Sequence, residues 1–183
     1  MDSIVSALWF FLPAGVANAA PVFAAKLPAL KHLKSPMDGG RSYKGTRLFG
    51  ANKTWRGLIA GIVLATLIIG LQKYLFTHSL WALEHSWFDY RPTSVWLLGP
   101  LLGAGALLAD VLESFFKRQR RIAPGDSWFP FDQTDYIIGG CLFSLPVVQL
   151  SLGKYLLVLI VWLSAHLLSV YIGYLAGIRD KPI

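Results

Sequence analysis

Five long hydrophobic stretches constrain the fold of this 183-residue chain more than any other feature of its sequence. A bilayer core of about 30 Å is crossed by roughly 20 apolar residues in an α-helix. The stretches lie at about 4–25, 57–76, 94–116, 136–152 and 155–177. Charged residues make up only 15% of the chain, whereas a soluble domain has about 25%. We therefore predict an all-α integral membrane protein, in which a bundle of about five transmembrane helices forms a single domain over residues 1–183.

The lysine and arginine residues are concentrated in the loops on one side of the predicted helices. Seven of them lie in the loop 31–56 and four in the loop 117–134, whereas the loops on the opposite side hold three. The positive-inside rule makes the basic loops cytoplasmic and places the N-terminus outside and the C-terminus inside. It also accounts for the net charge of +7 without a nucleic acid partner. We predict a multi-pass protein of the cell membrane.

The first hydrophobic stretch has one feature of a cleaved signal peptide. Ala17-Asn18-Ala19 resembles a signal-peptidase site, but the preceding Met1-Asp2-Ser3 contains no lysine or arginine. We therefore interpret this stretch as a retained membrane helix, kinked at Pro13 and Pro21.

The first of two polar blocks fills the second half of the loop 31–56. It combines glycines, which let the backbone approach an anionic ligand, with the cations Lys53 and Arg56, which neutralise phosphate charge. It leads into the N-terminus of the second helix, where free N–H groups favour anions. The alternative is an ordinary loop whose cations only fix the topology. The residue types favour phosphate binding by a block that includes Asp38, Gly39, Gly40, Gly50, Asn52, Lys53, Thr54 and Arg56.

The second polar block follows the end of the third predicted helix. Asp110, Ser114 and Lys117 are spaced at i, i+4 and i+7, so they form one polar stripe on a helix. Asp132 and Asp135 share a face where the fourth helix begins. Three carboxylates brought together would repel each other unless a divalent cation lay between them, and oxygen ligands of this kind suit Mg²⁺. The sequence therefore predicts a magnesium site at one end of the bundle.

Some of these residues also have a purely structural interpretation. Asp132 is a candidate helix N-cap, and Asp135 in the first turn would favour the helix dipole. This interpretation does not explain why Asp110 occurs together with Ser114. Glu113 is predicted to lie off the polar stripe and to pair with a nearby arginine.

Together the two blocks resemble a family of membrane enzymes. Asp110-x-x-x-Ser114-x-x-Lys117-Arg118, followed by Asp132-x-x-Asp135, is similar to the signature of membrane CTP:phosphatidate cytidylyltransferases. The first block, from Asp38-Gly39-Gly40 to Gly50-Ala51-Asn52-Lys53-Thr54-Trp55-Arg56-Gly57, more closely resembles the CDP-archaeol synthase branch, as do the short five-helix plan and Asp132-Gln133. The resemblance covers about 36–140. Two departures are Ala109, where the family commonly has glycine, and the absence of a His-Gly-Gly run before Asp132.

The resemblance implies a CTP-dependent cytidylyltransferase with its active site at the cytoplasmic face. The phosphate of a membrane lipid, archaeal-type 2,3-bis-O-geranylgeranylglyceryl phosphate or similar, would attack the α-phosphorus of CTP to give a CDP-lipid and pyrophosphate. Mg²⁺ is the expected cofactor, with room for a second cation such as K⁺. The implied metal ligands are Asp110, Asp132 and Asp135. The implied phosphate or nucleotide contacts come from the first block and from Lys117 and Arg118, with Ser114 orienting a phosphate or a metal-bound water.

Three alternative functions remain open from the sequence. In the first, the enzyme acts on diacyl phosphatidate rather than on an isoprenoid ether lipid. In the second, the protein binds lipid or nucleotide without turnover. A transporter or channel is the third alternative, and it would place polar residues near the middle of the membrane rather than at one end.

Overall fold

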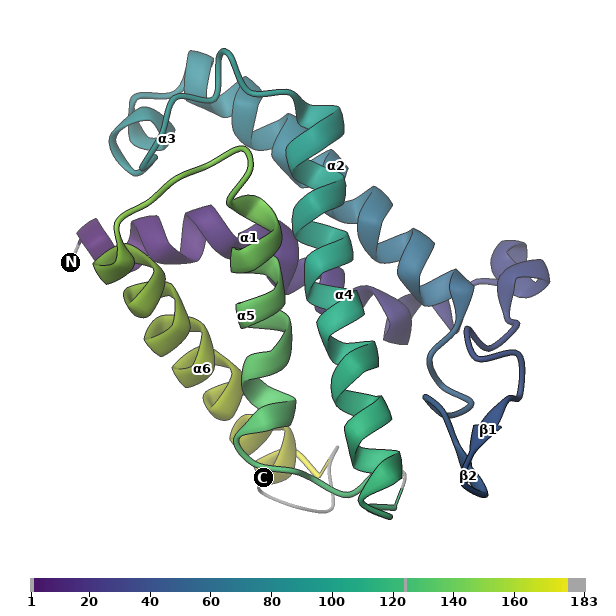
Figure 1. Ribbon diagram of the computed structural model, residues 1–183. Coiled ribbons are helices and arrows are strands. Elements are labelled where there is room, and N and C mark those ends of the chain that lie inside the picture. The colour runs from purple at the N-terminus through teal and green to yellow at the C-terminus, as the bar shows by residue number, and fades with distance from the viewer. Residues whose placement is uncertain (1, 124, 178–183) are drawn as a thin grey trace.

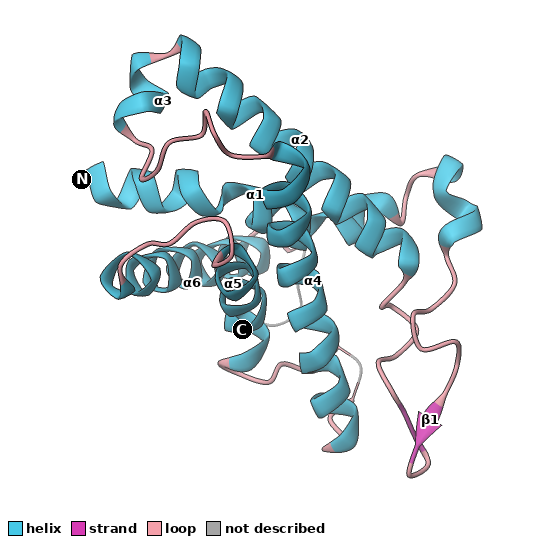
Figure 2. Ribbon diagram, turned by 45° about the horizontal axis from the view of Figure 1, so that its top comes forward, coloured by secondary structure: helices cyan, strands magenta, loops and turns pink. Residues whose placement is uncertain are grey.

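The computed structural model describes residues 2–123 and 125–177 as a bundle of helices (Figure 1). The main helices are α1 (Asp2–Ala24), α2 (Trp55–His78), α4 (Val95–Gln119), α5 (Phe131–Ser144) and α6 (Leu152–Leu175). A short 3₁₀ helix, η1 (Pro28–Leu33), and a small hairpin of β1 (Ser42–Tyr43) and β2 (Thr46–Arg47) lie between α1 and α2, and α3 (Leu80–Glu84) follows α2. Figure 2 shows the hairpin projecting from one end of the helices. The predicted all-α class is confirmed.

Four of these helices, namely α1, α2, α4 and α6, are long and apolar enough to cross a membrane. The predicted fourth stretch, 136–152, differs from the structure, because the corresponding helix α5 begins at Phe131 and ends at Ser144. Its 14 residues extend about 21 Å, which is shorter than the roughly 30 Å of a bilayer core. Pro146 explains the early end, since it has no N–H to donate to the carbonyl oxygen of Leu142, which accepts from the N–H of Leu145 instead. The multi-pass membrane fold therefore combines four long helices with a shorter one.

Glycines spaced four residues apart predict close packing of helices, and the sequence has three such pairs, Gly57/Gly61, Gly99/Gly103 and Gly173/Gly177. A side chain at Gly57 or Gly61 of α2 would meet Pro21 or the carbonyl oxygen of Ala17 on α1, and one at Gly103 of α4 would meet Ile62 on α2. The pair Gly173/Gly177 is different, since Gly177 lies beyond the end of α6 with a φ of 70° and nothing within 4 Å. Close backbone approach in membrane helices is favoured by small residues, so the first two pairs are packing residues.

The crossing of α4 and α5 is the contact that matters for the polar residues. Gly105 and Gly139 face each other so closely that a side chain on either one would collide with the backbone carbonyl oxygen of the other. Gly139 also lies against the methyl group of Ala109. This crossing lies one turn before Asp110 on α4 and one turn after Asp135 on α5, and it therefore draws these two carboxylates together.

Aromatic residues close the opposite end of the bundle. The Gln72 amide donates to the carbonyl oxygen of Trp9 at 2.5 Å and accepts from the Tyr90 hydroxyl at 3.3 Å. Tyr90 is buried, and Trp87 and Phe88 pack against the same core. This end of the described structure is closed by rings and one satisfied polar network. The polar residues singled out from the sequence lie at the other end of the bundle.

Candidate functional site

The basic, glycine-rich loop between η1 and α2 is folded around the carboxylate of Asp38. This carboxylate accepts hydrogen bonds from the guanidinium of Arg47 at 2.9 and 3.0 Å. It also accepts from three backbone N–H groups, those of Gly40 at 2.9 Å, Phe49 at 3.2 Å and Gly50 at 3.1 Å. The Arg47 guanidinium, together with these N–H groups, holds the pKa of Asp38 well below its usual range. The Asp38 side chain is fully enclosed, so it orders the loop and does not face a ligand.

The folded loop is anchored to α2 and α4. The N–H of Met37 donates to the carbonyl oxygen of Lys53 at 2.7 Å, and the Phe49 ring lies 6.5 Å from that of Phe115 on α4. Thr54 caps the N-terminus of α2 by accepting from the N–H of Gly57 at 3.3 Å. These contacts place the stretch 49–53 directly beside the polar stripe of α4.

Three carboxylates meet where α4 crosses α5. Oxygen atoms of Asp110, Glu113 and Asp135 all lie within 4.8 Å of one another, a spacing that allows one metal ion to contact all three. Glu113 is 8% exposed, and its Oε1 has no hydrogen-bond partner among the described residues. A buried carboxylate oxygen without a partner is costly, and a cation bound by the cluster would relieve this cost. The donor set therefore fits a hard divalent cation such as Mg²⁺.

The position of Glu113 corrects the interpretation made from the sequence. Its side chain points into the cluster, and its charged neighbour is Lys117 at 3.8 Å, not an arginine. Glu113 follows Asp110 by three residues, and residues three apart on a helix are neighbours. The strict spacing of four and seven residues used for the polar stripe missed it for this reason.

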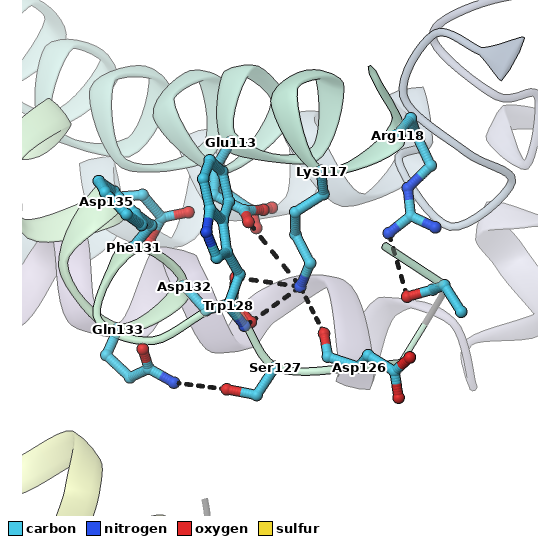
Figure 3. Close-up of polar contacts among 12 residues, drawn as sticks. Glu113, Lys117, Arg118, Asp126, Ser127, Trp128, Phe131, Asp132, Gln133 and Asp135 are labelled. Carbon is cyan, nitrogen blue, oxygen red and sulfur yellow. Dashed lines mark hydrogen bonds and ion pairs between the residues drawn. The ribbon is translucent and has the colours of Figure 1, made fainter. Parts of the chain in front are cut away.

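Asp132 lies beside Glu113 of the carboxylate cluster, and groups of the chain engage both of its oxygens. Both of its oxygens accept from Lys117 Nζ, at 3.0 and 2.8 Å, and Oδ2 also accepts from the N–H of Trp128 at 2.9 Å (Figure 3). Lys117 Nζ donates in addition to the carbonyl oxygen of Asp126 at 2.6 Å. The N-cap of α5 is Pro130, so Asp132 is not the helix cap that its position suggested. It fastens the loop 126–128 to α4 through Lys117.

Burial among the helices is the main reason why the pKa of Asp135 is raised to about 8, and repulsion from the nearby Asp110 carboxylate adds to it. Asp135 lies outside the four helices long enough to cross a membrane. A carboxyl group with such a raised pKa retains a proton that a metal ion must displace. Metal binding at this cluster is therefore expected to depend on pH.

A polar cavity of about 440 Å³ opens between the glycine-rich loop and α4. Its lining brings together most of the residues that the sequence singled out, cations and carboxylates among them. The lining residues are Phe49, Gly50, Ala51, Asn52, Lys53, Asp110, Glu113, Ser114, Lys117, Arg118, Gly125 and Asp132. Gly39, Gly40 and Arg56 are not part of this lining, and Thr54 contributes to a smaller hollow beside it.

An apolar groove of about 730 Å³ runs between α4 and α5 from the same point. Its walls are hydrophobic side chains, including Leu112, Phe116 and Leu142, and Trp128 and Phe131 lie along it. Asp135 also lines this groove, and Glu113 and Phe49 line both the groove and the polar cavity. The carboxylate cluster therefore lies at the junction of a polar and an apolar compartment. Phe49 was missed from the sequence, since a single phenylalanine in a glycine-rich loop carries no pattern.

The whole chain, residues 1–183, matches the model of the CarS-like CDP-archaeol synthase family. Curated proteins named CDP-archaeol synthase from Thermococcus onnurineus and Thermococcus gammatolerans are 34% and 35% identical over 183 residues, which is 100% of this chain and 98% of each relative. A third, from Methanococcus aeolicus, is 30% identical over 97% of this chain and 95% of its own length.

A solved structure also resembles this fold. It is described as an intramembrane enzyme for archaeal membrane lipids biosynthesis, and it superposes with a TM-score of 0.70 at 27% sequence identity. The match covers 89% of this chain and 91% of that chain. The likeness therefore extends over nearly the whole bundle.

Proposed function

The chain belongs to the CDP-archaeol synthase family, and we propose from this membership that it transfers the cytidylyl group of CTP to the phosphate of a membrane lipid. The products would be a CDP-lipid and pyrophosphate. One observation carries the proposal, namely that the polar cavity and the apolar groove meet at the carboxylate cluster. A water-soluble nucleotide and a lipid chain require such adjoining compartments, because each must be bound while their phosphates react.

In this proposal the polar cavity holds the triphosphate. Lys53, Lys117 and Arg118 line it and neutralise phosphate charge, and Ser114 and Asn52 supply neutral polar contacts. The glycines around residues 39–50 act indirectly, since they allow the tight loop around Asp38 that brings Lys53 to the cavity. Thr54 caps α2, and neither Thr54 nor Arg56 lines the polar cavity.

The groove between α4 and α5 would hold an apolar chain of the lipid, with its phosphate beside Glu113 and Asp135. We propose an archaeal-type ether lipid phosphate, such as 2,3-bis-O-geranylgeranylglyceryl phosphate, because the relatives over the full chain are named for CDP-archaeol. Diacyl phosphatidate is the competing substrate, and the walls of an apolar groove do not by themselves distinguish the two.

We propose Asp110, Glu113 and Asp135 as the carboxylates that would hold Mg²⁺. This set replaces Asp132 of the sequence-based prediction with Glu113, because oxygen atoms of Asp110, Glu113 and Asp135 lie within 4.8 Å of one another. When bound, the metal ion would neutralise charge on the triphosphate. A second cation such as K⁺ belongs to the same proposal.

The remaining chemistry is positioning by residues of the chain. The lipid phosphate has a second pKa of about 6, so it is largely dianionic at neutral pH and needs no strong general base. Lys117 and Arg118 would stabilise the departing pyrophosphate, as cations do in other phosphoryl transfers. Lys117 is held rigidly by Asp132 and the carbonyl oxygen of Asp126, so its ammonium group is preorganised for this role.

We also propose that the site faces the cytoplasm, with the N-terminus of α1 on the outside. The basic loop 31–56 and the loop 117–134 flank the polar cavity at one end of the bundle, in agreement with the positive-inside rule. The end of α6 lies at this same end of the molecule in Figure 1. The predicted position of the C-terminus concerns residues 178–183, which lie outside the described residues.

Reconstitution of the purified protein in vesicles tests the function directly. Labelled CTP and Mg²⁺ are offered with the unsaturated ether lipid phosphate or with phosphatidic acid, and CDP-lipid is separated from CTP. We expect the ether lipid to be the better substrate and Asp110→Asn to abolish turnover. Asp89→Asn, which removes an exposed acid at the opposite end of the bundle, serves as the matched control. The enzyme proposal is rejected when the wild type makes no CDP-lipid from either lipid.

A further inference from the structure

The Lys53 side chain lies directly on a carboxylate of the proposed metal site. Its Nζ atom is 2.6 Å from Oδ1 and 2.6 Å from Oδ2 of Asp110. The ammonium group therefore stands in front of both oxygens. A metal ion that binds Asp110 approaches the same oxygens, so it cannot contact both while Lys53 remains in place.

Lys117, the other lysine of the polar cavity, is held in a different way. Its three protons have acceptors in the oxygens of Asp132 and in the carbonyl oxygen of Asp126, and its side chain is 9% exposed. The Lys53 side chain is 24% exposed, and within the described chain the hydrogen bonds of its Nζ go to Asp110. Lys117 is therefore fixed by several elements, whereas a single partner holds the Lys53 ammonium group.

The Lys53 backbone is anchored independently of the side chain. Its carbonyl oxygen accepts from the N–H of Met37 at 2.7 Å, and the next residue, Thr54, caps α2. The side chain lines the polar cavity together with Asn52 and Arg118. Rotation of this long, flexible side chain can therefore carry the ammonium group from Asp110 into the cavity while the loop stays in place.

We propose that Lys53 is an internal counter-ion of Asp110 which a divalent cation must displace, and that the displaced ammonium group then pairs with a phosphate in the polar cavity. The inference rests on the proposed function, since it assigns Asp110 to the metal and the cavity to phosphates. Lys53 acts as a positioning residue that couples the two binding events. A divalent cation alone binds against competition from Lys53, and its arrival releases a cation for the triphosphate.

Mn²⁺ binding in the absence of nucleotide tests the competition. The full chain in detergent is titrated with Mn²⁺, and the free ion is measured by electron paramagnetic resonance. We expect Lys53→Gln to bind Mn²⁺ about three- to tenfold more tightly than the wild type, as expected when a partly exposed ion pair of about 1 kcal/mol no longer competes. Lys53→Arg keeps the competing charge and should bind Mn²⁺ much like the wild type.

Lys44→Gln is the matched control for a general loss of positive charge. Lys44 is exposed on the same loop, in the turn between β1 and β2, and its recorded contact is with the neighbouring Tyr43 ring. Its replacement should leave Mn²⁺ affinity nearly unchanged. Equal or weaker Mn²⁺ binding by Lys53→Gln relative to Lys44→Gln would overturn the proposal.

Chemical modification of the wild type provides a second readout that needs no folded variant. The rate at which an amine reagent acetylates Lys53 is followed by mass spectrometry, with Lys44 of the same molecule as the internal reference. Mn²⁺ should raise the relative rate at Lys53 severalfold, and inorganic pyrophosphate added with Mn²⁺ should lower it again. A rate at Lys53 that does not respond to Mn²⁺ contradicts displacement.

These measurements fail separately from the proposed activity. Neither one uses turnover, so displacement of Lys53 can be established in a protein that makes no CDP-lipid. Conversely, CDP-lipid formation by a protein whose Lys53 does not respond to Mn²⁺ would leave the activity standing and reject the counter-ion role.

Discussion

At the scale of single residues, the site depends on which carboxylates are already satisfied by the protein. Asp38 and Asp132 both accept several hydrogen bonds from nearby cations and backbone N–H groups. Glu113 Oε1 has no hydrogen-bond partner among the described residues, Asp135 accepts from one backbone N–H, that of Tyr136, and both residues lie against the apolar groove. Unsatisfied buried carboxylates favour a cation much more strongly than satisfied ones do. The division separates acids that order loops from Glu113 and Asp135. Asp110 belongs to neither group, because both of its oxygens accept from Lys53.

This division predicts different effects for two substitutions. Glu113→Gln should weaken Mn²⁺ binding by about tenfold or more and reduce CDP-lipid formation in parallel, because it removes one charged ligand. Asp132→Asn should leave Mn²⁺ binding nearly unchanged but loosen the loop 126–128, which hydrogen exchange would detect. Equal losses of Mn²⁺ affinity in both variants would contradict the assignment of Glu113 in place of Asp132.

The raised pKa of Asp135 predicts a pH dependence of metal binding. Below about 8 this carboxyl group is protonated in the metal-free protein, and the metal requires the ionised form. Affinity for Mn²⁺ should therefore rise with pH, by up to about tenfold per unit below the pKa, and level off above it. Calorimetry at pH 7 in two buffers of different ionisation heat should show that Mn²⁺ binding releases protons. Absence of proton release would contradict the raised pKa of Asp135.

At the scale of elements, the crossing of α4 and α5 assembles the site. The direct contact of Gly105 with Gly139 lets the two backbones approach, and the same faces carry Asp110 and Asp135 one turn away. Interhelical packing thus controls the distance between carboxylates that come from separate parts of the chain. Ala109 contributes its methyl group to this contact, so the departure from glycine at that position is accommodated by Gly139.

Replacing Gly139 by a larger residue should therefore disturb the carboxylate cluster, although Gly139 itself is not part of it. A methyl group in Gly139→Ala would collide with the Gly105 carbonyl oxygen and the Ala109 side chain, and overpacking of this kind costs about 1–3 kcal/mol. We expect a lower melting temperature and weaker Mn²⁺ binding. Gly153→Ala is the control, because a side chain at Gly153 would meet nothing within 4 Å. The crossing is not critical if both variants melt and bind Mn²⁺ alike.

At the scale of the whole molecule, polar and apolar features are separated along the bundle. The polar cavity and the basic loops lie at one end, the aromatic closure formed around Gln72 and Tyr90 lies at the other, and the groove extends from the carboxylates along α4 and α5. The described residues thus offer a nucleotide access from the water and a lipid chain access from the side. This arrangement suits a reaction at the membrane surface.

Filling the groove should separate lipid binding from nucleotide binding. Leu112 lines the groove and is largely exposed, so Leu112→Trp would narrow the space for a chain without reaching the polar cavity. We expect the KM for the lipid phosphate to rise several-fold, with CTP affinity unchanged. Leu71→Trp, on an exposed face of α2, is the matched control. A change in CTP affinity with no change in the lipid KM would place the lipid elsewhere.

The sequence by itself determined the class of fold, the two polar blocks and most residues of the polar cavity. Long apolar runs and local charge are properties of neighbouring residues, so they can be read without knowing the packing. The length of α5 was harder to predict, because apolar residues continue beyond Ser144 although the helix ends before Pro146. The predicted loop also included Asp38 among the ligand contacts, since composition does not show that Arg47 and three backbone N–H groups satisfy its carboxylate.

Only the tertiary structure decided how the carboxylates divide their roles. Whether Glu113 joins Asp110 depends on which face of α4 meets α5, and the contact between Gly105 and Gly139 sets that face. Whether Asp132 is free depends on Lys117, which lies on another helix and also binds the intervening loop. Such pairings arise from burial and close packing between distant segments, and no local periodicity records them.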